Sequence, residues 1–289
     1  MEYQITSGQA HKQRSNCIVI GVFEDRKLPR ETAQLDQAAG GSLSRLLKRS
    51  DLTGKLGQSL LLLDLPGVTA DRVLLVGCGR EKDLDTRQYH KLMGHLAEVL
   101  KPFQCPEIIS YLSLLPIKGR SVYWQVRFCI EALDHHFYQF KGYQSQPVES
   151  LKIKRLVVAI PSRAALKTAE AALAHAKASV EASRFSRDLG NMPGNIATPT
   201  YMAEQTKAFN TLPKVKVEVL DQAKMTELNM NAILAVARGS SEAPFLASAI
   251  YQGGKASDRP IVLVGKGITF DTGGVALKTW PAMHPMNLS

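Results

Sequence analysis

Short apolar runs alternate with stretches of helical length in the first part of this chain, and this alternation limits the folds that it can adopt. The runs are rich in Ile, Val and Leu and have the length of buried strands; they cover residues 17–23, 59–65, 72–77, 107–112 and 156–160. Stretches between them predict helices at residues 29–49, 86–100 and 121–137. This order predicts an α/β domain in which helices flank a largely parallel or mixed sheet.

An alanine-rich stretch follows the last of these strands. Residues 162–189 contain almost no helix breaker, so they predict a long connecting helix. Ser162 suits the N-cap of this helix, and Gly190 suits a left-handed C-terminal cap. We therefore expect three parts: an N-terminal domain at residues 1–160, the connecting helix at 161–190 and a second domain at 191–289.

The sequence after the connecting helix predicts the beginning of a second α/β domain. A helix is expected from about residue 200, followed by a strand at residues 216–220. Two short helices are then expected at 222–228 and 230–237, before strands at 246–251 and 260–264.

The composition favours a folded globular protein. Hydrophobic residues make up 45% of the chain and charged residues 21%, which leaves no case for extended disorder. No apolar run approaches the roughly 20 residues of a membrane helix, and the N-terminal text lacks an apolar signal region. We expect a cytoplasmic protein that does not enter a membrane.

The cysteines and the net charge narrow the function classes further. The four cysteines are scattered singly, so they predict buried free thiols in place of a disulfide framework or zinc site. The formal charge of +10 is compatible with nucleic-acid binding. The basic residues are dispersed, however, and no aromatic stripe alternates with them, so we favour a solvated basic surface.

The most informative stretch is IVLVGKGITFDTGGVALK at residues 261–278. A strand-like run leads into Lys266, Asp271 and Lys278, and strand ends in α/β proteins are common places for functional sites. A lysine held near a dication can lose its proton and ligate through nitrogen, and an aspartate can bridge two metal ions. By spacing alone, an ordinary salt bridge between Lys266 and Asp271 remains equally acceptable.

A phosphate-binding loop is a weaker interpretation of the same stretch. The order GxxxxGK[ST] is absent, and the pattern GxGxxG fails at its last position, which is Phe270.

Two motifs resemble those of the leucyl (cytosol) aminopeptidase family, bacterial type. The run VGKGITFDTGGVALK, at residues 264–278, is very similar to that family's VGKG-[IV]-TFD-[ST]-GG segment and its following lysine. The upstream residues resemble the family's R-x3-N-x-P-x-N-x3-P-x3-A segment; they are Arg187, Asn191, Pro193, Asn195, Pro199 and Ala203. Both motifs occur in the family's order.

The resemblance implies a fold, an activity and roles for particular residues. It implies an N-terminal macro-like α/β domain, a connecting helix and the beginning of an α/β metallopeptidase catalytic domain. Lys266 and Asp271 correspond to metal ligands, with Asp271 bridging, and Lys278 corresponds to the catalytic lysine. Met286 corresponds to a residue of the substrate pocket. The implied enzyme uses two divalent ions, Mn²⁺ or Zn²⁺, removes N-terminal residues from peptides and works as a homo-hexamer.

The chain departs from the family pattern after Lys278. It continues TWPAMHPMNLS, and Ser289 stands where the family carries a further metal-binding aspartate. A later Asp-x-Glu pair of metal ligands has no counterpart in this sequence. We therefore expect a truncated catalytic domain that is weakly active or inactive alone. The alternative is a non-catalytic binding module that uses the basic N-terminal domain, with DNA as a candidate partner.

Overall fold

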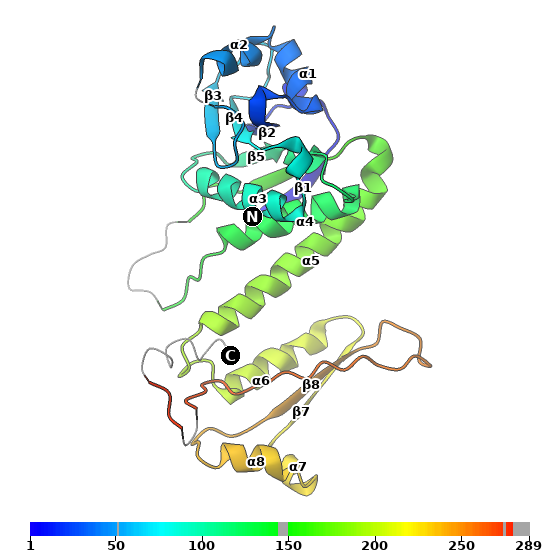
Figure 1. Ribbon diagram of the computed structural model, residues 1–289. Coiled ribbons are helices and arrows are strands. Elements are labelled where there is room, and N and C mark those ends of the chain that lie inside the picture. Colours follow the sequence, from blue (N-terminus) through cyan, green and yellow to red (C-terminus); the bar gives the residue numbers. More distant parts are fainter. Residues whose placement is uncertain (51, 144–149, 274–275, 280–289) are drawn as a thin grey trace. The chain divides into compact units, whose positions relative to one another are not determined.

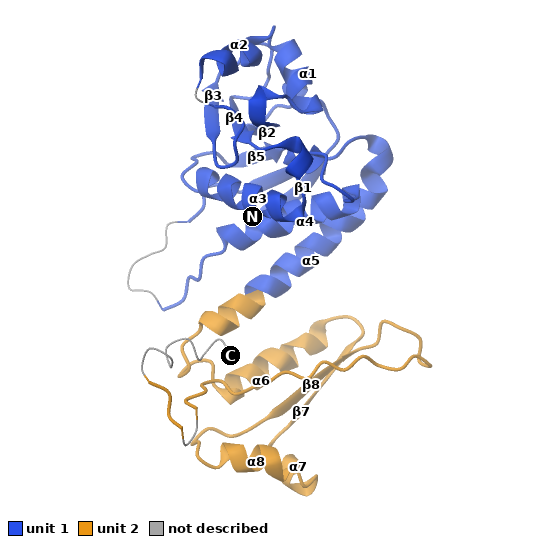
Figure 2. Ribbon diagram, in the orientation of Figure 1, with its two compact units in different colours: residues 1–184 blue, residues 185–289 orange. Residues whose placement is uncertain are grey.

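The computed structural model describes residues 1–50, 52–143, 150–273 and 276–279 (Figure 1). The chain divides into two compact units, residues 1–184 and 185–289 (Figure 2). Each unit is an α/β structure, which confirms the predicted fold class. The limits predicted from the sequence for the three parts of the chain stay a prediction.

A six-stranded sheet forms the centre of the first unit. Its spatial order is β1-β6-β5-β2-β4-β3, and every neighbouring pair is parallel except β3 with β4. The strands are β1 Glu2–Thr6, β2 Ile18–Val22, β3 Ser59–Leu63, β4 Arg72–Gly77, β5 Glu107–Ser110 and β6 Arg155–Ala159. Five of them match runs predicted from the sequence, and β1 was not predicted.

Alternate side chains of the central strands point to opposite faces of the sheet, so two separate cores form. Val19 and Leu74 belong to the core shared with α3 (Thr86–Leu100), α4 (Val122–Phe137) and α5 (Leu166–Asn191). Ile20 and Leu75 belong to the core shared with α1 (Arg30–Ala38) and α2 (Ser42–Arg49). The unit is therefore a three-layer structure (Figure 1).

The single helix predicted at residues 29–49 is wrong, because the chain forms α1 and α2 there. Gly40 and Gly41 separate the two helices with φ angles of +61° and +75°. This left-handed conformation ends the first helix and costs glycine little. The two-glycine signal was present in the sequence and marks the break.

The alanine-rich helix α5 forms as predicted, with shifted ends. A short 3₁₀ turn at Arg163–Ala165 precedes it, and Ser162 makes no capping side-chain hydrogen bond. The helix continues through Gly190 to Asn191. Its small residues Ala169, Ala172 and Ala176 are fully buried, so the helix lies close against the first unit's core.

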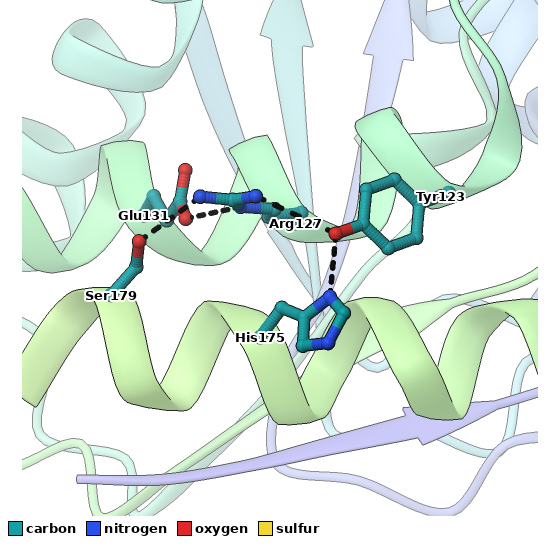
Figure 3. A network of polar contacts seen from close by, with 5 residues as sticks. All are labelled: Tyr123, Arg127, Glu131, His175 and Ser179. Atoms are coloured by element: carbon teal, nitrogen blue, oxygen red, sulfur yellow. Dashed lines mark hydrogen bonds and ion pairs between the residues drawn. The ribbon is translucent and has the colours of Figure 1, made fainter. Parts of the chain in front are cut away.

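Polar side chains link α4 to α5 along the edge of that packing (Figure 3). The Tyr123 hydroxyl lies 2.7 Å from Nδ1 of His175. Arg127 donates to Oε1 of Glu131 over 2.6 Å and to the hydroxyl of Ser179 over 3.1 Å. Buried alanines of α5 thus pack in the core, and polar side chains join α4 to α5 at the edge of that packing.

The described residues of the second unit form fewer strands than the sequence predicts. Helix α6 (Pro199–Ala208) packs on an antiparallel pair made by β7 (Val215–Leu220) and β8 (Leu246–Tyr251). Helices α7 (Gln222–Glu227) and α8 (Asn231–Ala237) connect the two strands. The strand predicted at residues 260–264 is wrong.

The side chains at residues 261–264 are exposed, by 91%, 74%, 92% and 93% in order. A strand needs a partner for its backbone groups, and this apolar segment pairs with neither β7 nor β8. Among the described residues, no helix is long and apolar enough to cross a bilayer.

Candidate metal centre

Lys266, Asp271 and Lys278 meet in one loop of the second unit. Nζ of Lys266 lies 2.5 Å from Oδ2 of Asp271, and Nζ of Lys278 lies 3.8 Å from the same oxygen. The structure therefore brings the three predicted residues together around a single carboxylate. The loop that holds them follows the exposed segment at residues 261–264.

Backbone contacts fix this arrangement from the carboxylate outward. The amide of Gly273 donates a 2.9 Å hydrogen bond to Oδ1 of Asp271, so both carboxylate oxygens are engaged. The amide of Lys278 donates to the carbonyl of Thr272 over 2.9 Å. The first bond holds the aspartate to the Gly273 amide, the second ties Lys278 to Thr272, and the Lys278 side chain lies beside the carboxylate.

The electrostatics of the cluster favour an ionised carboxylate. The hydrogen bond from Lys266 is the largest cause that lowers the pKa of Asp271 to about 2, followed by the Gly273 amide. The positive charge of Lys278 acts in the same direction. A carboxylate that stays ionised at neutral pH is the form that binds cations.

The cluster is accessible from solvent. The side chains of Lys266, Asp271 and Lys278 are 47%, 24% and 32% exposed. A divalent ion could take an aspartate oxygen and a deprotonated lysine nitrogen here, so the residues fit part of a metal site. In the described ranges, no group of three or more His, Cys, Asp or Glu side chains is placed to hold a metal ion.

The two sequence motifs also meet in space. Gly194 of the upstream motif faces Phe270, the residue before Asp271. A Cβ added at Gly194 would lie 3.4 to 3.5 Å from Phe270. The loop between α5 and α6 therefore supports the chain next to the candidate site. Spacing in the sequence gave no sign of this contact.

The role of the Gly273 amide was also missed by the sequence reasoning. Its signal was the order Asp-Thr-Gly, because an aspartate often accepts a hydrogen bond from the amide two residues later. Met286, predicted to line a substrate pocket, lies outside the described residues.

The fold and the site define an α/β protein with a lysine-flanked carboxylate in a solvent-accessible loop. Two models of one family match the chain: "Cytosol aminopeptidase family, N-terminal domain" at residues 19–147, and "Cytosol aminopeptidase family, catalytic domain" at residues 184–289. The chain belongs to the cytosol aminopeptidase family.

Curated relatives agree with this family. The probable cytosol aminopeptidase of Thioalkalivibrio sulfidiphilus is 42% identical over 288 residues, which is 99% of this chain and 58% of the relative. The probable cytosol aminopeptidase of Psychromonas ingrahamii is 43% identical over 99% of this chain and 57% of the relative. The chain thus spans a little over half the length of these relatives.

Solved structures share the fold. The bottromycin maturation enzyme BotP in complex with Mn matches with a TM-score of 0.71 and 23% identity, over 95% of this chain and 52% of that protein. A mutant of tomato leucine aminopeptidase matches with a TM-score of 0.67 and 22% identity, over 85% of this chain and 49% of that protein.

Proposed function

We propose that this chain carries metal-binding and electrophilic residues of an aminopeptidase that releases N-terminal, leucine-like residues from peptides. The observation that carries the proposal is the convergence of Lys266 and Lys278 on one carboxylate oxygen of Asp271. The family membership of the chain and the names of its relatives support the same activity.

Each residue of the cluster has a separate task in the proposed site. Asp271 would provide carboxylate oxygens to the metal, and Lys266 would provide a nitrogen once it has lost its proton. Bound divalent ions supply Lewis-acid polarisation of the scissile carbonyl and lower the pKa of water. The ammonium of Lys278 stabilises the negative charge that develops on the carbonyl oxygen during attack.

The wider features of the enzyme belong to the same proposal. We propose that the site binds two divalent ions, Mn²⁺ or Zn²⁺. The manganese named for the BotP structure supports the choice of Mn²⁺. Met286 is proposed to line the pocket for the substrate's first side chain. A cytoplasmic homo-hexamer is proposed for the enzyme, and the word cytosol in the names of the relatives supports that location.

The described donors are too few to hold paired dications tightly. Lys266 and Asp271 together offer one nitrogen and one carboxylate, whereas paired metal ions need several carboxylates to neutralise their charge. We therefore expect weak metal binding and low turnover by the 289-residue chain by itself.

The test is hydrolysis of a leucine chromogenic amide by the purified chain with added manganese. Lys278→Ala should lower manganese-dependent turnover by about 100-fold, because it removes a group that stabilises the oxyanion. Lys224→Ala is the matched control, since Lys224 pairs with Glu227 in α7. Manganese-dependent turnover as fast in Lys278→Ala as in the unchanged chain would contradict the proposed role.

A second candidate function is binding of DNA by the first unit. Helix α2 carries Arg45, Lys48 and Arg49, and a hollow of about 440 Å³ beside it is lined by Ser42, Arg45, Leu46, Arg49 and Ser50. Cationic side chains of this kind neutralise phosphates and release counterions. DNA affinity that falls steeply between about 50 mM and about 200 mM salt would favour this function. Affinity that is absent at the lower salt concentration would exclude it.

A further inference from the structure

We propose that Gly273 is a positioning residue that brings the ammonium of Lys278 to Asp271. The inference rests on the proposed function, in which Lys278 must lie beside the metal-binding carboxylate. It adds a residue whose own side chain takes no part in the chemistry.

The backbone of Gly273 adopts a conformation that other residues avoid. Its φ angle is +93°, in the region where a side chain clashes with the backbone. Replacement by any L-residue therefore strains the backbone at this position, even before neighbouring atoms are considered.

Atoms of nearby residues also fill the space around Gly273. A Cβ at this position would lie 2.6 Å from the carbonyl oxygen of Ala276 and 3.0 Å from Cγ of Lys278. The first distance is below the contact distance of real Cβ atoms, and the neighbour is backbone, which moves at greater cost. The second contact is with the stem of the lysine that reaches Asp271.

The hydrogen bonds show what the close approach achieves. The Gly273 amide holds Oδ1 of Asp271 at 2.9 Å, while the Lys278 amide holds the Thr272 carbonyl at 2.9 Å. These two bonds hold the carboxylate at the Gly273 amide and tie Lys278 to Thr272. A side chain at Gly273 would push Lys278 away from Asp271.

Two other glycines of the second unit have open space around them. A Cβ at Gly267, in the same motif, or at Gly239, in the loop after α8, would meet nothing within 4 Å. Neither glycine has a positive φ angle. Gly239→Ala is therefore a matched control for the general effect of replacing glycine by alanine.

Zero-length cross-linking with a carbodiimide tests the proposal on the 289-residue chain. This reagent joins a lysine to a carboxylate that it contacts, and fragmentation in the mass spectrometer identifies the linked pair. The wild-type chain should give Asp271–Lys278 and Asp271–Lys266 links. The Lys224–Glu227 pair, 2.7 Å apart in α7, is an internal reference for the yield of the reaction.

Gly273→Ala should lower the yield of the Asp271–Lys278 link by about tenfold, because a proximity-driven reaction slows steeply when its groups move apart. The Asp271–Lys266 and Lys224–Glu227 links should persist, and Gly239→Ala should change none of the three. Gly273→Asn should behave like Gly273→Ala, since asparagine tolerates positive φ angles but keeps the clashing Cβ.

An Asp271–Lys278 yield that is unchanged in either Gly273 variant would overturn the positioning role, and so would equal loss of all three links. The links form without metal or substrate, so the result is separate from the proposed function. Loss of the one link in a chain that binds no manganese would leave Gly273 as a positioning residue and would refute the metal site.

Discussion

Nε of Arg184 donates a 2.9 Å hydrogen bond to Oδ2 of Asp134, a carboxylate whose side chain is only 4% exposed. The hydroxyl of Tyr3 donates to the other carboxylate oxygen. Strand β1, helix α4 and helix α5 are therefore tied to one buried charge. A buried carboxylate is tolerated when such partners surround it, and its loss leaves those partners unsatisfied.

Asp134→Ala should destabilise the first unit by about 3 kcal/mol, because it leaves the buried Tyr3 hydroxyl without this acceptor and removes a buried carboxylate that Arg184 contacts. Urea unfolding followed by circular dichroism measures the loss. Glu204→Ala is the control, because Glu204 pairs with Lys207 on an exposed helix surface and should contribute under about 0.5 kcal/mol. Equal effects of the two changes would refute the special role of the buried carboxylate.

The polar contacts between α4 and α5 should contribute less to the free energy of unfolding than the contacts of Asp134 do. Tyr123→Phe removes the hydroxyl that lies 2.7 Å from Nδ1 of His175 (Figure 3). Because the pair is exposed and water replaces it, the expected cost is about 0.5 to 1 kcal/mol in the same unfolding experiment. A loss as large as that of Asp134→Ala would show that these contacts contribute more than this single bond.

The environment of His136 predicts that the first unit loses stability in mild acid. Burial lowers its pKa most, followed by the neighbouring His135 and His90, while Glu98 opposes the shift and Lys101 adds to it. Nε2 of His136 is buried and has no hydrogen-bond partner in the described part of the chain. The unfolded chain thus binds this proton more readily than the folded chain does.

The contribution of His136 is fully present above the unfolded pKa of about 6.5 and is lost as pH falls from there toward the lower folded pKa. Unfolding curves of the wild-type chain and His136→Gln, measured between about pH 8 and about pH 5, test this window. The variant should show the flatter dependence. A variant as pH-sensitive as the wild type would contradict the assignment.

The exposed apolar segment of the second unit predicts self-association of the 289-residue chain. Leu263 is 92% exposed between apolar neighbours that are also exposed, which forms a continuous patch. Leu263→Lys should shift sedimentation toward a smaller species. Leu63→Lys, at a residue that is 64% exposed on edge strand β3, is the matched control and should have less effect. A larger effect at Leu63 would place association on the first unit's sheet edge.

Elements with a strong local signal were predictable from the sequence. Helix α3 has the predicted bounds, because its apolar residues recur at helical spacing and Asp85 caps its start by accepting from the Gln88 amide. Strand β1 was missed because EYQIT is largely polar, and its place in the sheet depends on pairing with the distant strand β6. Residues 260–264 read as a strand, but pairing decides whether a strand forms.

The candidate site was also only partly predictable from the sequence. The family resemblance implied metal ligands at Lys266 and Asp271 and a catalytic Lys278, whereas spacing alone left an ordinary salt bridge equally acceptable. The structure joins the three residues by ion pairs, and their metal-binding and catalytic roles stay a prediction. The contacts that shape the loop depend on φ angles and on distances between non-adjacent residues. Neither the closed space at Gly273 nor the packing of Phe270 on Gly194 can be read from spacing alone.

Titration of the 289-residue chain with Mn²⁺, followed by electron paramagnetic resonance, tests most directly whether Asp271 is a metal ligand. We predict weak binding by the wild-type chain, with a dissociation constant of about a millimolar, because few ligands are available. Asp271→Asn should abolish that binding, and Asp221→Asn, at the cap of α7, should leave it unchanged. Binding that is equally strong in Asp271→Asn would contradict the proposed metal centre.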